Sequence, residues 1–377
     1  MLKKFSIIAG LALMPVSVAL ADDVKLPGTI AVTAADVGGT SYNQAIAIGK
    51  ALQDAYGVSL RVVGTGNPQA KVAPVRDGRM PFSIAGSDVF FAFEGVDDYA
   101  SPDWGPQDLR AVSLVGGDNC LTYIVAGDAG IETMADFKGK RIPWVVGSSP
   151  LQANAKAMLA FGGLTIDDVT LVEMPSYGAA IDAMINGQVD GVTTVSTGGL
   201  VEKAVAGPRG LKYVPYPHDD AEGWARMREV NPHFAKRVAT QAAGGLKEPL
   251  ECIGVPYPDV ITYSDDSDLV YNFTRALVEQ VDVYSKADPS TAGFAADKQM
   301  FEWTVPYHEA SIKAYREAGT WTDELDAHND ALLARAAVLA DAWATTEDMR
   351  GDADFQEQWM KIRAEALQAA GMPAYFQ

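Results

Sequence analysis

Along the chain, short apolar runs alternate with segments whose apolar positions recur every three or four residues. Residues 29–34 alternate apolar and polar side chains, as a half-buried strand does, and apolar positions over 45–56 follow helical spacing. Similar strand patterns at 59–64 and 82–85 enclose a short helical segment that ends at Asp77-Gly78. This alternation predicts strand–helix–strand units, which form parallel sheets with helices on their faces.

Residues 141–200 repeat that order. Strand patterns stand at 141–146, 169–172 and 189–195. Helical patterns lie between them, and the loops after the strands are rich in glycine and serine. Ser149-Pro150 predicts a helix start, since serine caps helices and proline suits their first turn. Thr40 or Ser41 is expected to cap the first helix of the other half in the same way.

The duplicated order predicts two α/β domains that face one another. In such domains the strand ends and the following helix N-termini line the ligand crevice. Helix N-termini present free N–H groups and favour anions, so a carboxylate is the expected ligand group. Beyond residue 263 the pattern is mainly helical, with helices expected at 268–286, 295–303, 307–319, 322–345 and 352–370.

The N-terminus has the pattern of a secretory signal. Lys3 and Lys4 precede an apolar run, and Ala19-Leu20-Ala21 forms a small-residue cleavage site before Asp22. The apolar run is shorter than the roughly 20 residues that a membrane-spanning helix needs. We therefore expect residues 1–21 to be a cleaved signal peptide and the mature protein to be periplasmic, without being embedded in a membrane.

The composition of the chain disfavours some classes of binding partner. The 377 residues carry 30 Lys+Arg against 49 Asp+Glu, a formal net charge of -19. A nucleic-acid partner is disfavoured, because no basic stripe is present to neutralise phosphates. Two cysteines and 4 histidines offer little for a metal site, so no metal and no cofactor is expected. An exported protein can form a disulfide between Cys120 and Cys252, and two buried thiols are the alternative.

Known catalytic motifs are missing from the sequence. The loop at Ser148-Ser149 lacks the second glycine of a nucleophile elbow, and His308-Glu309 has no second histidine at the spacing of a zinc protease. The glycine-lysine pairs do not stand in a phosphate-binding loop. A non-enzymatic binding protein is therefore the favoured class, with an exported enzyme as its rival.

Four segments resemble one known family. Val37-Gly38-Gly39-Thr40-Ser41-Tyr42 is similar to its opening loop and Ser87-Asp88-Val89 to its loop after the third strand. The segment from Asp136 to Ser149 and the late segment from Val305 to Gly319 are similar to two further signatures. The chain thus resembles TAXI-type solute-binding proteins, the extracytoplasmic receptors of a subset of TRAP transporters.

The resemblance implies a two-lobed type II periplasmic-binding-protein fold. Its sheets are expected to be rich in parallel strands, flanked by helices and joined by hinge strands, with extra helices at the C-terminus. Lobe I is expected to comprise 22–122 and 255–377, and lobe II 123–254. The family's ligands are organic acids and amino acids, and its partner is the TRAP membrane permease. We expect a monomeric receptor that closes on its ligand by hinge bending.

The expected ligand-binding residues come from the loops of both halves: Gly39, Thr40, Tyr42, Asn67, Ser87, Trp144, Ser149, Gln152 and Thr197. Thr40 and Ser149 are expected to contact the ligand carboxylate, and Trp144 to wall the pocket. A disulfide between Cys120 and Cys252 would lie near the hinge and stiffen it. A sensor of the same ligands, without transport, is an alternative function that the sequence leaves open.

Overall fold

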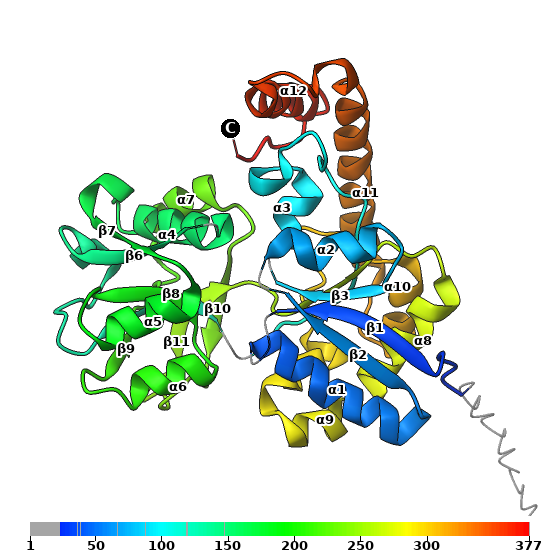
Figure 1. Ribbon diagram of the computed structural model, residues 1–377, viewed down its shortest axis with the longest axis horizontal. Helices are drawn as coiled ribbons and strands as arrows, with labels where there is room; N and C mark the ends of the chain where they lie inside the picture. Colours follow the sequence, from blue (N-terminus) through cyan, green and yellow to red (C-terminus); the bar gives the residue numbers. More distant parts are fainter. Residues whose placement is uncertain are drawn as a thin grey trace, which may run out of the picture.

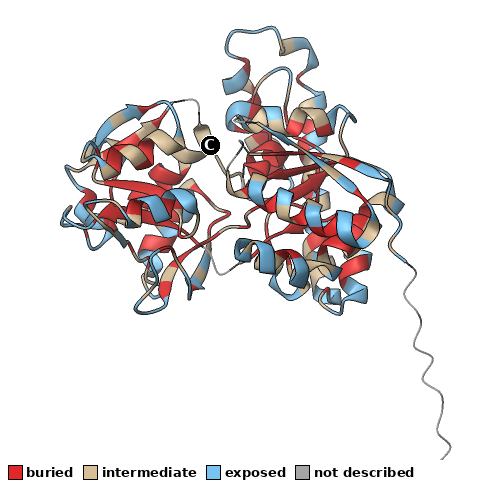
Figure 2. Ribbon diagram, turned by 60° about the horizontal axis from the view of Figure 1, so that its bottom comes forward, coloured by how far each residue is buried: buried red, intermediate tan, exposed pale blue. Residues whose placement is uncertain are grey.

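The structure is a computed structural model that describes residues 23–376 except 36, 38, 66, 87, 118, 119 and 147. The expected signal peptide and Ser87 lie outside the described residues. The chain forms two lobes joined by crossing segments, and a pair of helices packs on one of the two lobes (Figure 1). Each lobe has its own buried interior, as the separate buried regions of Figure 2 show.

Lobe I is built on a five-stranded sheet in the order β2-β1-β3-β12-β4. Its strands are β1 (Thr29–Ala34), β2 (Ser59–Gly64), β3 (Phe82–Ala85), β4 (Arg110–Leu114) and β12 (Asp259–Thr262). The first three pair in parallel, as predicted, whereas β12 runs antiparallel to both β3 and β4. The sheet is therefore mixed, because the chain returns from lobe II and inserts β12 into it.

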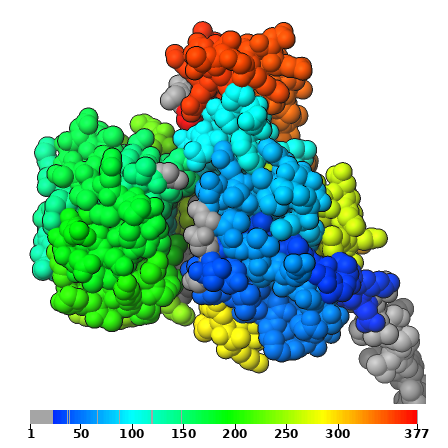
Figure 3. Space-filling model, viewed as in Figure 1, coloured from blue at the N-terminus to red at the C-terminus, as the bar shows by residue number. Residues whose placement is uncertain are grey.

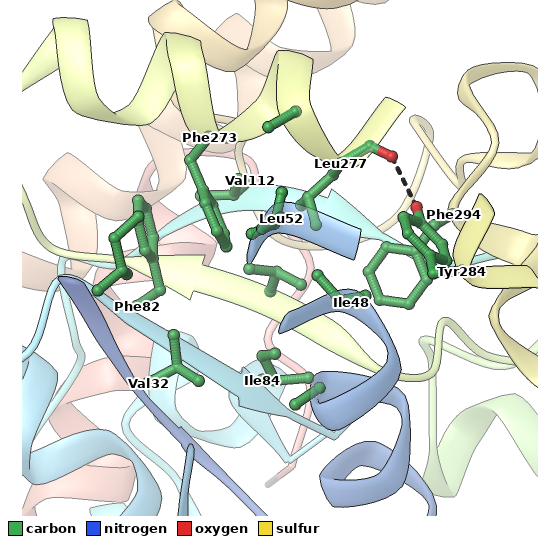
Figure 4. Close-up of a cluster of buried hydrophobic side chains, with 14 of the residues drawn as sticks. Val32, Ile48, Leu52, Phe82, Ile84, Val112, Phe273, Leu277, Tyr284 and Phe294 are labelled. Carbon is green, nitrogen blue, oxygen red and sulfur yellow. Dashed lines mark hydrogen bonds between the residues drawn. The ribbon is translucent and has the colours of Figure 1, made fainter. Parts of the chain in front are cut away.

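Helices cover both faces of this sheet. They are α1 (Thr40–Tyr56), α2 (Pro68–Arg76), α3 (Val89–Glu94), α8 (Ser267–Glu279), α9 (Val281–Ala287) and α10 (Glu309–Glu317). Figure 4 shows the core between the sheet, α1 and α8, where Phe82 stacks on Phe273 with ring centroids 4.2 Å apart. Ile48 and Leu52 of α1 are fully buried there. This burial orients α1 so that its N-terminus points toward lobe II.

Lobe II holds a sheet in the order β10-β11-β5-β8, a further strand β9 that pairs with β5, and a separate β6–β7 pair. Its strands are β5 (Leu121–Ala126), β6 (Arg141–Val145), β7 (Thr170–Met174), β8 (Gly191–Val195), β9 (Leu211–Tyr213), β10 (Ala235–Ala239) and β11 (Leu250–Gly254). Its helices are α4 (Ser149–Phe161), α5 (Tyr177–Ile185), α6 (Gly199–Val205) and α7 (Ala221–Val230).

Parallel pairing in lobe II is limited to β6 and β7 within the described residues, whereas β5 pairs antiparallel with β8, β9 and β11. Pro143, in the middle of β6, has no backbone N–H to donate to a neighbouring strand. At the start of the same strand, the backbone N–H of Arg141 donates to the Asp190 side-chain carboxylate at 2.9 Å. The lobe is thus less parallel than the strand–helix alternation suggested.

Cys120 and Cys252 form a disulfide with a Cα–Cα distance of 5.9 Å. Cys120 immediately precedes β5, and Cys252 lies in β11, which pairs with β5 through Ile253 and Leu121. Both cysteines therefore sit on the lobe II sheet, one where the chain enters that lobe and one where it leaves. The bond closes lobe II on itself beside the crossing segments, where it was expected, and stiffening of the hinge by it stays a prediction.

The segment expected to form a helix at 295–303 does not do so. It contains one 3-10 turn, η5 (Ala296–Lys298), and follows another, η4 (Pro289–Phe294). The Gln299 side-chain amide donates to the carbonyls of Phe294 and Ala295 at 3.2 and 3.3 Å, which removes acceptors that a helix would use. Gln299 Oε1 accepts from the Leu114 N–H, so the segment is tied to β4.

Two helices, α11 (Asp323–Ala344) and α12 (Phe355–Ala369), stand on lobe I next to α3 (Figures 1 and 3). They are attached through Glu94 at the end of α3, which is fully buried. Arg335 of α11 and Arg363 of α12 both pair with its carboxylate. Trp359 adds a hydrogen bond from Nε1 to the Gly95 carbonyl at 2.6 Å.

Candidate functional site

The candidate site lies where the strand ends of the two lobes face one another. In lobe I, β1 leads into α1 and β2 leads into α2, and in lobe II, β6 leads into α4 and β7 leads into α5. None of these four helices has an acidic residue in its first turn. Their N-termini thus keep a partial positive charge that no side chain of the same turn neutralises.

The predicted helix caps need correction. Gly39, not Thr40 or Ser41, is the N-cap of α1, and no side chain caps that end. The Ser41 hydroxyl instead accepts a hydrogen bond from Ala35 N at 3.1 Å, which fixes the loop before the helix. Ser148 rather than Ser149 is the N-cap of α4, again without a side-chain bond. Among the described residues, no side chain therefore caps α1 or α4 at the N-cap position, although the Ser41 backbone in the first turn of α1 bonds to the Tyr257 hydroxyl.

Two contacts between the lobes each involve one predicted residue, Thr40 in the first and Ser149 in the second. A β-carbon built on Gly198 would lie 3.5 Å from Thr40 Oγ1, so the loop after β8 meets the start of α1. Gly198 has φ 123°, a conformation that side chains rarely adopt, and only glycine serves there without strain. The Ser149 hydroxyl donates to Asp98 of lobe I at 2.9 Å. The lobes are thus in contact at both ends of this row of loops.

Other predicted residues are engaged within their own lobe. Asn67 caps α2 through Oδ1, which accepts from Ala70 N at 2.9 Å. Gln152 donates to the Val145 carbonyl at 3.0 Å. Tyr42 packs against the lobe I core. These side chains shape the loops, and whether they touch a ligand stays a prediction.

Trp144 and Thr197, two further predicted residues, have different surroundings. Trp144 is half-buried in β6, with Lys156 Nζ of α4 5.7 Å from its ring centroid. Thr197 lines an interlobe pocket of about 750 Å³ beside the crossing residues Gly116 and Gly117. That pocket also contains Arg237 and the segment around Lys298, so Thr197 borders both it and the loop that faces Thr40.

Two tyrosines that the sequence analysis did not select lie close enough to interact, Tyr177 of lobe II and Tyr257 of the crossing segment that returns to lobe I. Tyr177, the first residue of α5, bonds through its hydroxyl to the Thr194 hydroxyl, and burial raises its pKa to about 12. Its phenol interacts electrostatically with Tyr257 of the returning crossing segment. Burial also raises the pKa of Tyr257, and this rise is partly offset by the charge of Lys71 and by hydrogen bonds with Ser41. Both phenols are therefore un-ionised at neutral pH.

Charged groups lie beneath these tyrosines. Lys71 of α2 is 3.3 Å from Asp88 Oδ1, and both side chains are largely buried. Asp259, at the start of β12, is fully buried, and neither of its carboxylate oxygens has a hydrogen-bond partner among the described residues. Burial, with Asp88 nearby, holds the pKa of Asp259 well above its usual range. Asp88 stood in a quoted motif, whereas nothing local marked Lys71 or Asp259.

Within the described part of the chain, no group of three or more histidine, cysteine, aspartate or glutamate residues is placed to hold a metal ion. The same residues include no helix with the length and apolar character needed to cross a bilayer.

Comparison with known families assigns most of the chain. Residues 32–319 match the model of the NMT1-like family. The chain belongs to the NMT1-like family. The matched range ends with the glycine that follows α10, so α11 and α12 lie beyond it.

Several solved structures are similar to this chain of the NMT1-like family. The alkanesulfonate-binding protein SsuA from Xanthomonas axonopodis pv. citri, bound to MOPS, is 15% identical with a TM-score of 0.44, covering 82% of this chain and 85% of that one. The aliphatic sulphonate binding protein SsuA from Escherichia coli is 13% identical with a TM-score of 0.41, covering 92% and 89%. An ancestral arginine-binding protein bound to arginine is 16% identical with a TM-score of 0.41, covering 72% and 97%.

The predicted fold class is confirmed. The chain of this NMT1-like protein has the two-lobed α/β periplasmic-binding-protein fold, with mixed sheets flanked by helices. By their descriptions, the three similar solved structures are binding proteins.

Proposed function

We propose that this protein is a periplasmic solute receptor that binds a small anionic metabolite, an organic acid or an amino acid, between its lobes. Membership of the NMT1-like family and the two-lobed fold support a binding function. The observation that carries the proposal is the meeting of Thr40 at the start of α1 with the Gly198 loop of lobe II. A ligand held there touches both lobes at once and therefore stabilises the closed form.

The chemistry of this region supports a carboxylate ligand. The N-termini of α1 and α4 lack a side-chain cap among the described residues, and their first turns contain no acidic residue. Tyr177 and Tyr257 add neutral phenols, which bond to Thr194 and Ser41 respectively. The Lys71 ammonium adds a cation at the floor of lobe I.

Delivery to a TRAP-type permease is the finer part of the proposal, and the TAXI resemblance supports it. The signal-peptide pattern of residues 1–21 supports a periplasmic location. N-terminal sequencing of the exported protein should give Asp22 as the first residue. An uncleaved N-terminus would contradict the proposed processing.

The ligand is testable by calorimetry after a thermal-shift screen of organic acids and amino acids. For the best ligand, Thr40→Ala and Ser149→Ala are each expected to weaken binding about tenfold, the value of one lost hydrogen bond to a charged group. The matched controls are Thr29→Ala and Ser59→Ala, exposed residues at the opposite ends of β1 and β2. Equal affinities for the site and control variants would refute the assignment of these two residues.

Two further measurements separate the rival classes. A turnover assay of each stabilising ligand should detect no product, and product formation would favour an exported enzyme. Uptake of the ligand by vesicles that contain a candidate permease should require the receptor. Receptor-independent uptake, together with intact ligand binding, would favour the sensor.

A further inference from the structure

A loop of lobe II is buried in lobe I. His233 lies between α7 and β10 and is only 3% exposed. Its ring centroid is 4.8 Å from that of Phe90 and 5.8 Å from that of Phe91, both in α3. Trp303 of lobe I stands at its edge, and Trp303 Nε1 donates to the His233 carbonyl at 3.3 Å.

The C-terminal tail completes the same aromatic cluster. The Phe376 ring lies 5.7 Å from Phe90 and 5.5 Å from Phe91. Figure 1 shows the C-terminal end next to α3, on the side that faces lobe II. Phe376 has φ 61°, which a bulky side chain seldom adopts. The ring contacts must therefore offset the cost of this backbone conformation.

The tail is fixed by the arginines that hold α11 and α12. Arg335 Nη1 donates to the Pro373 carbonyl at 2.9 Å, and Arg363 Nη1 donates to the Tyr375 carbonyl at 2.5 Å. Both guanidinium groups also pair with Glu94, which follows Phe90 by four residues and Phe91 by three in the sequence of α3. One buried carboxylate thus ties the tail to the helix that receives His233.

Contacts of α4 lie next to this cluster. Ala153 of α4 packs against the buried lobe I cluster that contains Phe90 and Phe91. Asn231 donates to Asn154 of α4 at 3.2 Å, so the loop that carries His233 is braced by the same helix. The interlobe contact is therefore a continuous face and not a single side chain.

We propose that residues 231–234 form a clasp that opposes separation of the two lobes: they dock against the aromatic rings of α3, in a cluster that the C-terminal tail helps to line, and α11 and α12 hold that tail in place. The lobes are connected covalently by crossing segments, and such connections leave hinge bending open. Separation would move His233 out of the aromatic cluster and expose Phe90, Phe91 and Phe376 to water, which is unfavourable. The helices beyond the NMT1-like match thereby acquire a role that needs no particular ligand.

The clasp is built for reversible contact. Neither ring nitrogen of His233 has a hydrogen-bond partner among the described residues, so its burial carries a desolvation cost. Burial lowers the pKa of His233 to about 3, and the ring is neutral at neutral pH. The charged or titratable groups on the packed elements bond elsewhere: Arg228 to the Phe234 carbonyl, His328 to the Trp303 carbonyl and Glu94 to the two arginines.

Lobe separation can be measured in the ligand-free full chain. Spin labels at Lys50→Cys and Lys138→Cys report the distance between the lobes, because both side chains are well exposed and stand on different lobes. His233→Ala removes the ring contacts to Phe90 and Phe91 that cross the lobes, and it is expected to raise the ratio of separated to closed molecules roughly two- to tenfold, the range for loss of an aromatic pair. His233→Glu should raise it further, since it buries a carboxylate among aromatic rings.

His233→Phe should change the same ratio in the opposite direction, because it removes the unsatisfied nitrogens and keeps the ring. A loss of folding cannot imitate that shift toward the closed form. His218→Phe is the matched control, as His218 lies on lobe II and interacts with Glu251 of the same lobe. Distance distributions unchanged from the parent in all three clasp variants would overturn the clasp and indicate a fixed pivot.

Discussion

Removal of the disulfide tests how lobe II is stabilised. The perturbation is the double variant Cys120→Ala/Cys252→Ala, which keeps a small apolar side chain at two buried positions. The cysteines are separated by 132 residues in sequence. For a loop of that length, the chain-entropy relation predicts that the disulfide lowers the conformational entropy of the unfolded chain by about 17 cal/mol/K. Removal of the bond should therefore lower the free energy of unfolding by about 5 kcal/mol at 25 °C. This is a third or more of the stability of an ordinary domain, which is roughly 5–15 kcal/mol.

The loss should be confined to one lobe. Cys120 and Cys252 lie where the chain enters and leaves lobe II, so the covalent loop encloses that lobe. Urea unfolding should therefore separate into two transitions, with lobe II unfolding first. Hydrogen exchange should lose protection in β5, β8 and β11 and keep it in β1, β3 and β4.

Two results would refute this reasoning. One is a loss below about 1 kcal/mol, which would mean that the unfolded chain is not appreciably freer without the bond. The other is an equal loss of protection in the lobe I sheet. The parent protein treated with a reductant is the control, and it should reproduce the variant.

Glu94→Gln should destabilise the protein by about 3–5 kcal/mol, because it leaves Arg335 and Arg363 buried without their shared carboxylate. Limited proteolysis should then cut first after residue 319, and continued protection of α11 and α12 would contradict the role given to Glu94. Asp259→Asn should raise the melting temperature at pH 7, since the raised pKa means that folding favours the protonated acid. The stability contributed by protonated Asp259 is fully present below the unfolded pKa of about 3.9 and is lost as the pH rises through the higher folded pKa. The gain in melting temperature from Asp259→Asn should therefore grow between pH 4 and pH 8. A gain in melting temperature that is the same at every pH would show that Asp259 does not titrate as inferred.

Much of the local structure was predictable. The strands expected at 29–34, 59–64 and 82–85 have the bounds found for β1, β2 and β3. Their side chains alternate or are wholly apolar, and each residue's own burial sets that pattern. The prediction failed where a side chain bonds both to its own segment and to a distant strand, as Gln299 of the segment expected at 295–303 does with Phe294 and with Leu114 of β4.

Pairing between distant residues was not predictable from the same pattern. The sequence left Cys120 and Cys252 as a disulfide or two thiols, and the adjacency of β5 and β11 decided it. His233 carried no local signal, because a lone histidine in a loop looks the same whether it is exposed or buried by another lobe. Its role depends on Phe90 and Phe376, which stand far from it in sequence.

The sequence by itself determined the order of strands and helices, the polar loops after the strands and the acidic charge. Those features follow from local periodicity and composition, which each segment carries alone. Tertiary structure decided which loops meet across the lobes, where β12 inserts and what the helices after Gly319 hold. Such contacts depend on the packing of the whole chain, and a pattern of burial records that a residue is covered without recording what covers it.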